Sequence, residues 1–132
     1  MRYLLDANIL SDLMRNPGGR VADKIGQSGD DQVGTSIIVV AELRYGIAKI
    51  RSRRLTAQFA AILGGIEVFG FDAPADAIYG TLRAELERSG LPIGANDLLI
   101  AAPALALRLT LVTGNERELS RVPNLRVENW LG

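Results

Sequence analysis

The sequence predicts an α/β fold, with a mostly parallel central sheet of four to five strands covered by helices on both faces. Two observations predict it. Short apolar segments that suit strands recur along the chain, and most are followed by longer segments with apolar residues three and four positions apart, which suit helices. Strands that alternate with helices in this way usually pair in parallel. At 132 residues, the chain is expected to form one domain, residues 1–132.

The first half of the chain predicts two strands, each followed by helices. Asp6 and Asn8 follow the first apolar run and suit the start of a helix, which Pro17 and the glycines after it end. Ser36 stands at the second join between strand and helix. The predicted elements are a strand at 2–5, helices at 7–15 and 20–27, a strand at 32–36 and a helix at 37–50.

The second half predicts the remaining strands and the clearest amphipathic helix. That helix spans 73–88, with Ile78, Leu82 and Leu86 on one face and charged residues on the other. The other predicted elements are a helix at 55–63, strands at 66–69 and 109–113, a helix at 97–107 and a last strand at 125–128.

The composition restricts the chemistry that the protein can perform. The chain has no cysteine and no histidine, which excludes thiolate zinc sites, cysteine nucleophiles and imidazole bases. Its 15 basic and 15 acidic residues cancel. The longest apolar run, residues 98–107, is about half a membrane span and contains Pro103, so a cytoplasmic protein with no membrane segment is expected.

Three carboxylates stand in apolar surroundings: Asp6, Glu42 and Asp97. A buried carboxylate needs a cation or hydrogen-bond donors, and a shared Mg²⁺ or Mn²⁺ is the simplest partner if the three converge. Each also has a plainer interpretation. Asp6 suits a helix cap, Asp97 a favourable charge at a helix start, and Glu42 an ion pair with the basic residues that follow it. Their positions at strand ends and helix starts favour a common site.

Two further features are candidates for function. Asn115 follows the predicted strand at 109–113, where its amide could bind substrate or serve only as turn chemistry, and Thr113 has the same two interpretations. Glu118 could reach the rim of the site or be solvated. Residues 44–54 carry five basic side chains and no acid, either an RNA-binding surface or a solvated helix face: Arg44, Lys49, Arg51, Arg53 and Arg54.

These residues resemble the motifs of PIN-domain ribonucleases of the VapC toxin family, from bacterial toxin-antitoxin pairs. Four segments carry the resemblance in order and span nearly the whole chain: residues 3–11, residues 35–46, residues 92–102, and residues 111–115 with 127–130. The resemblance implies a Mg²⁺- or Mn²⁺-dependent endoribonuclease with Asp6, Glu42 and Asp97 as metal ligands and Asn115 as a fourth site residue. It also implies an RNA substrate such as tRNA, a homodimer, and a small antitoxin that presents a cationic side chain to the acidic site.

Two residues depart from the family pattern. Ala7 stands where the family usually has threonine, so a hydroxyl beside the site is missing. Pro103 stands where many relatives have histidine, and a proline inside a helix removes a backbone donor, so a local bend is expected there. Two other functions remain open from the sequence: a binding module that holds RNA or antitoxin without cleavage, and a metal-dependent phosphatase of small substrates.

Overall fold

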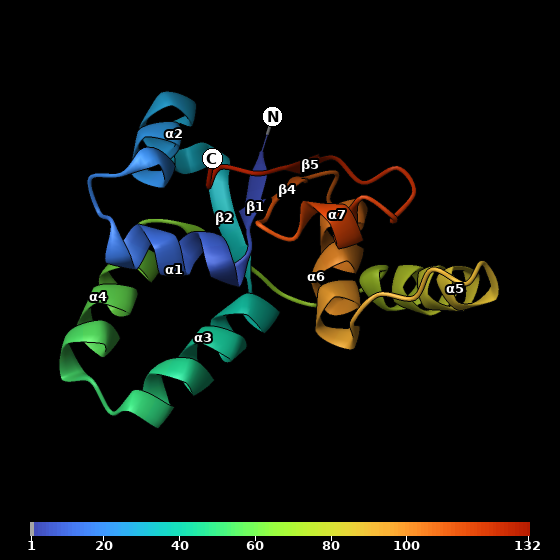
Figure 1. Cartoon of the computed structure of the whole chain (residues 1–132), viewed down its shortest axis with the longest axis horizontal. Helices are drawn as coiled ribbons and strands as arrows, with labels where there is room; N and C mark the ends of the chain where they lie inside the picture. The colour runs from blue at the N-terminus through green and yellow to red at the C-terminus, as the bar shows by residue number, and fades with distance from the viewer. Residues whose placement is uncertain (1) are drawn as a thin grey trace.

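The computed structural model describes residues 2–132 and contains one five-stranded sheet (Figure 1). The strands lie in the order β3-β2-β1-β4-β5, and every neighbouring pair is parallel. They are β1 (Tyr3–Leu5), β2 (Val33–Ser36), β3 (Glu67–Phe69), β4 (Thr110–Val112) and β5 (Val127–Glu128). The predicted fold class is confirmed, and the sheet is entirely parallel among these residues.

The helices lie in two groups, one on each side of the sheet (Figure 1). The first group is α1 (Ala7–Arg15), α2 (Arg20–Ser28), α3 (Ile37–Ile50) and α4 (Arg53–Leu63), and the second is α5 (Ala75–Arg88), α6 (Ala95–Ala106) and α7 (Glu116–Leu119). The strand order explains the division. The chain moves from β1 to β2 and β3, then reverses to β4 and β5, and right-handed crossovers in opposite directions place helices on opposite faces.

The centre of the sheet is also the centre of the core. Leu4 and Leu5 of β1 and Leu111 and Val112 of β4 are fully buried, because helices cover both faces of these two strands. Burying a side chain of this size contributes roughly 1.5–3 kcal/mol. The hydroxyl of Thr35 on β2 donates to the carbonyl oxygen of Leu5 at 2.7 Å, which ties the ends of β1 and β2 together.

The structure differs from the sequence prediction mainly at element boundaries. The sequence predicted no helix between the strands at 109–113 and 125–128, but Glu116–Leu119 forms the short helix α7. A 3₁₀ turn, Asp30–Gln32, precedes β2. Helix α6 begins at Ala95 rather than Asp97, which places Asp97 within its first turn. Helix periodicity is weak in so short a segment as α7, which is why the sequence did not reveal it.

Pro103 lies inside α6, and the helix continues past it to Ala106. Asp97 is in the first turn of the helix and Pro103 in its last half. The missing backbone donor therefore affects the end of α6 away from Asp97. The helix is uninterrupted at Pro103, and the bend expected there stays a prediction.

Among residues 2–132, none of the helices combines the length and the apolar character that crossing a membrane requires.

Candidate active site

The candidate site lies where β1 and β4 run side by side. At this point the strand order reverses, because β2 and β3 lie on one side of β1, and β4 and β5 on the other. Asp6 follows β1 and Thr113 follows β4, and the Asp6 amide donates to the carbonyl oxygen of Val112 at 2.9 Å. The carboxyl edge of a parallel sheet at such a reversal is where open α/β folds bind ligands. The topology therefore places the first predicted carboxylate in a favoured position.

Asp6 is held from both sides of its carboxylate. It is 4% exposed. Its Oδ1 accepts from the amide of Ala7 at 2.7 Å, and its Oδ2 accepts from the hydroxyl of Thr113 at 2.8 Å. Its backbone carbonyl also begins the hydrogen bonds of α1, accepting from Ile9 and Leu10. Asp6 thus caps α1, which confirms the cap interpretation, and its role as a metal ligand stays a prediction.

Thr113 and Asn8 position the loop after β4. The fully buried Thr113 hydroxyl accepts from the amide of Asn115 at 3.0 Å while it donates to Asp6. Asn8 Oδ1 accepts from the amide of Gly114 at 2.9 Å, which joins α1 to the same loop. The sequence indicated only capping chemistry for Asn8 and left Thr113 open. Thr113 is a polar residue directly after a strand and Asn8 a polar residue in the first turn of the helix that follows one, and these positions are the signals that could identify them.

Asn115 brings a further carboxylate to the site. Its side-chain amide donates to Asp97 Oδ2 at 3.1 Å and to Glu118 Oε2 at 3.0 Å. Glu118 Oε1 accepts from the amide of Gly94 at 2.8 Å, so α7 is joined to the start of α6. These bonds place Asn115 and Glu118 beside Asp97, and the sequence had left the location of Glu118 open.

Glu42 reaches the same region from α3. Its Oε1 is buried and has no hydrogen-bond partner among residues 2–132. Burial raises the pKa of the Glu42 carboxyl, and the charges of Asp6 and Asp97 raise it further. No basic residue pairs with Glu42 in this part of the chain, so the proposed ion pair with the basic residues after it is not formed.

The pKa values of the two other acids, Asp97 and Glu118, are shifted in opposite directions. Burial raises the pKa of Asp97, and the charges of Asp6 and Glu118 add to the rise, against a lowering by the Asn115 amide. The hydrogen bond from Asn115 and that from the Gly94 amide lower the pKa of Glu118. The three predicted carboxylates are therefore close enough for their charges to repel one another, and this repulsion is what a bound cation would relieve.

The side chains suit a hard divalent cation in chemical type. All the candidate ligands are carboxylate oxygens, which Mg²⁺ and Mn²⁺ prefer, and the Glu42 Oε1 atom has no other partner in the described part of the chain. Within residues 2–132, however, no three acidic side chains are gathered tightly enough to hold a metal as they stand. Carboxylates can raise one another's pKa at separations several ångströms longer than the roughly 2.1 Å between a metal ion and its ligand, so the pKa shifts and the lack of a tight acidic cluster are compatible. Metal binding would require these side chains to move closer together.

The predicted RNA-binding residues extend from the middle of α3 to the start of α4. All five are exposed. Arg44 stacks over the ring of Phe59 with its guanidinium carbon 5.7 Å from the ring centre, and the Lys49 ammonium is 4.9 Å from the centre of the Tyr45 ring. Two of the five side chains thus have intramolecular partners, and the role in RNA binding stays a prediction.

The raised pKa of Glu42 predicts that Glu42→Gln stabilises the protein at pH 8. The folded state holds this proton more tightly than the unfolded state, whose glutamates titrate near 4.5, so wild-type stability falls as pH rises through the folded-state pKa. Glutamine removes the buried charge. Urea unfolding of both proteins at pH 8 and near pH 4 should show an advantage for Glu42→Gln that disappears in acid. Glu85→Gln, at an exposed position of α5, is the matched control. A gain in stability from Glu42→Gln that does not depend on pH would contradict the prediction.

Comparison with known proteins identifies the family of the chain. The family model for the PIN domain matches residues 3–125. A curated relative, "Ribonuclease VapC2" from Rickettsia felis, is 39% identical over 132 residues, and the match covers 98% of each chain. Another, "tRNA(fMet)-specific endonuclease VapC" from Shigella flexneri, is 34% identical over 131 residues, again with 98% of each chain covered.

Solved structures agree in fold. A chain from the crystal structure of VapBC2 from Rickettsia felis, bound to a DNA fragment from its promoter, superposes with a TM-score of 0.90 at 38% identity and covers 98% of this chain and 99% of that one. A chain from DNA-bound VapBC of Salmonella typhimurium gives 0.90 at 32% identity, covering 98% of both. With its parallel sheet and its group of carboxylates at the carboxyl edge, this chain belongs to the PIN-domain family, within the VapC group of ribonucleases.

Proposed function

We propose that the protein is a metal-dependent endoribonuclease toxin that hydrolyses RNA phosphodiester bonds and is inhibited by a cognate antitoxin. The observation that carries the proposal is that Asp6 and Asp97 lie near enough to Glu42 for their charges to raise the pKa of its carboxyl, while one buried Glu42 oxygen has no donor among residues 2–132. Relatives that match over almost the full chain are named ribonucleases, which favours RNA over other phosphate esters.

Each polar side chain has a distinct part in this proposal. Asp6, Glu42 and Asp97 would hold Mg²⁺ or Mn²⁺, which when bound supplies Lewis-acid stabilisation of the negative charge that develops on the phosphate. Thr113 fixes the orientation of Asp6 through its 2.8 Å hydrogen bond. The side-chain amide of Asn115 donates to both Asp97 and Glu118, which orients the two carboxylates and lessens their mutual repulsion.

Ala7 leaves the proposed ligand set intact. Its backbone amide donates to Asp6 Oδ1, a bond that does not depend on the side chain. Thr113 supplies a hydroxyl to the other oxygen of the same carboxylate. Asp6 therefore has a donor for each of its oxygens without the hydroxyl that most of the family carries at position 7.

Partners follow from the relatives. The Shigella flexneri relative is named a tRNA(fMet)-specific endonuclease, and several structural neighbours are VapBC toxin-antitoxin complexes. We infer a structured RNA substrate such as tRNA, a VapB-type antitoxin, and a homodimer for this chain. The exposed basic residues of 44–54, from the middle of α3 to the start of α4, would contact the RNA backbone.

Metal removal tests the proposal directly. Purified protein incubated with total tRNA is expected to cleave it in Mg²⁺ or Mn²⁺, to lose the activity in EDTA, and to regain it when the ion is restored, because the carboxylates alone supply no positive charge to the phosphate. Asp97→Asn protein prepared in parallel controls for contaminating nuclease. RNA binding without cleavage in Mn²⁺ would support the binding module instead, and turnover of a generic phosphate ester without RNA cleavage would support the phosphatase.

A further inference from the structure

A pocket of about 260 Å³ lies at the opposite edge of the sheet from the carboxylates. It is formed where α6 ends and β4 and β5 begin, whereas Asp6 and Thr113 follow the far ends of β1 and β4. Its lining residues are Ala104, Leu105, Arg108, Leu109, Asn124 and Arg126. None of the proposed site residues or of the basic residues 44–54 belongs to it, so its function is separate from the one proposed above.

The charge of this pocket is unbalanced. Arg108 and Arg126 line it and no acidic residue does. Neither guanidinium forms a hydrogen bond or ion pair within residues 2–132, whereas Arg2, Arg15 and Arg83 each pair with a carboxylate. The end of α6 contributes about half a negative charge to the same place, which two guanidinium groups outweigh. An anion therefore finds a net positive potential there.

The backbone around the pocket is fixed, although its charged side chains are exposed. Arg108 and Asn124 both have positive φ angles, of 56° and 68°. The Leu109 amide donates to the carbonyl oxygen of Ala104 at 2.8 Å, and the carbonyl oxygen of Arg126 accepts from the Leu111 amide at 2.8 Å. The strands and the helix end thus hold the backbone at both arginines in place.

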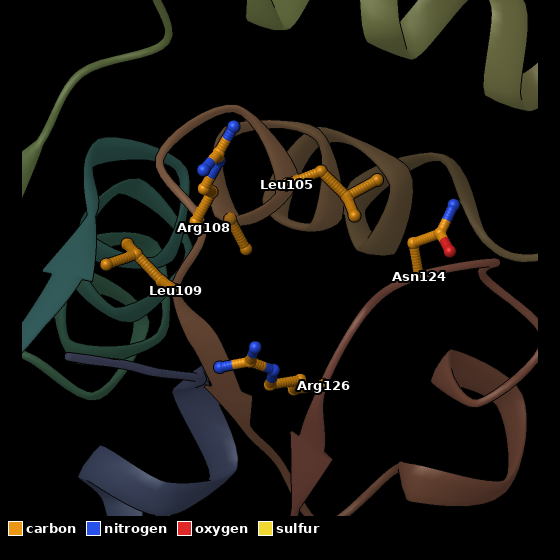
Figure 2. A pocket seen from close by; sticks show the side chains of 6 residues that line it. Leu105, Arg108, Leu109, Asn124 and Arg126 are labelled. Atoms are coloured by element: carbon orange, nitrogen blue, oxygen red, sulfur yellow. The ribbon is translucent and has the colours of Figure 1, made fainter. Parts of the chain in front are cut away.

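Figure 2 shows how these side chains lie. The Arg126 side chain extends from the start of β5 toward β4, while Arg108 and Asn124 lie apart on the rim with their polar groups directed away from Arg126. Leu105 and Leu109 supply apolar surface near them. The pocket therefore offers one guanidinium inside, another at the rim, a side-chain amide and an apolar wall.

We propose that this pocket binds a phosphate group carried by a nucleotide unit. A guanidinium fork matches phosphate oxygens in pairs, so Arg126 would contact the phosphate, and Arg108 supplies a second positive charge at the rim. Leu105 and Leu109 would contact the attached sugar or base, which explains an apolar wall that a simple inorganic ion does not need. The nucleotide unit can come from a free mononucleotide or from an RNA chain, and these two sources share the same recognition chemistry.

Binding measurements without cleavage test the proposal. The full-length protein in EDTA would be titrated with AMP and, separately, with a fluorescent single-stranded RNA, and compared with Arg108→Gln/Arg126→Gln and with Arg20→Gln, an exposed arginine on α2. Affinity is expected to fall about tenfold or more in the double variant only. Loss confined to AMP identifies the free nucleotide, and loss for RNA, with a salt dependence reduced by about 0.7–1.4 in slope, identifies the chain.

A second measurement keeps the proposal testable if the double variant does not fold. The side-chain Nε–H resonance of Arg126 in the wild-type protein should shift on titration with AMP or RNA more than that of Arg20. Equal affinities of the double variant and the Arg20→Gln control, or an unshifted Arg126 resonance with both probes, would overturn the proposal. Because no cleavage is measured, an inactive enzyme would leave this result unaffected.

Discussion

Asp97→Asn is expected to reduce RNA cleavage by at least about 100-fold while the fold remains intact. The substitution removes one of the three negative charges that would hold the cation, and losing a single electrostatic contact to the reacting phosphate commonly has an effect of this size. The fold should survive because asparagine keeps an oxygen that can accept from Asn115, and because burial and neighbouring acids already disfavour the charge on Asp97. Single-turnover cleavage of tRNA and urea unfolding measure the two effects.

The matched control is Asp23→Asn, on the exposed surface of α2, which should leave cleavage unchanged. Asp6→Asn is a less clean test of the same idea. An asparagine there would direct its NH₂ group toward one of the two donors that now serve the carboxylate, so it should lose stability as well as activity. Full cleavage by Asp97→Asn protein would show that the carboxylate group does not perform the reaction.

Gly34→Ala is expected to lower the free energy of unfolding by roughly 2–4 kcal/mol, a large effect for one methyl group. Gly34 lies in β2, paired with Leu4 of β1 and Glu67 of β3. A Cβ atom there would lie 2.6 Å from a ring carbon of Phe69 and 2.8 Å from the backbone oxygen of Glu67. A strand backbone cannot move aside without loss of its ladder hydrogen bonds. The midpoint of urea unfolding measures the change.

Gly80→Ala is the control for this substitution. Gly80 lies within α5 with no atom near the position of a Cβ, so alanine should instead raise the free energy of unfolding by about 0.5–1 kcal/mol through its better helix propensity. The two substitutions add the same methyl group and are expected to have opposite signs. Equal effects from both would show that the close packing between β2 and β3 does not limit stability.

The layers of the fold could be predicted from the sequence because its periodicity is local. Apolar runs such as Leu4-Leu5 and the spacing of Ile78, Leu82 and Leu86 require only the geometry of a strand or a helix. Segments of three or four residues carry too little of that signal, so α7 was missed and several boundaries moved by one or two residues.

The candidate site, too, could be predicted from the sequence only in part. The identities of Asp6, Glu42, Asp97 and Asn115 were evident from carboxylates and an amide next to apolar segments, and from the resemblance to known ribonucleases. That Thr113 donates to Asp6 across 107 positions of sequence could not be predicted, because the contact exists only where β1 and β4 are neighbours. The same is true of Glu118, which Asn115 connects to Asp97.

The sequence by itself determined the α/β class, most of the elements and the candidate acidic residues, because each follows from local spacing and residue type. Only the tertiary structure decided the strand order, which donors hold each carboxylate, and the unpaired oxygen of Glu42. It alone placed Arg108 and Arg126 around one pocket at the far edge of the sheet. These properties depend on which distant segments become neighbours, and packing of the whole chain sets that.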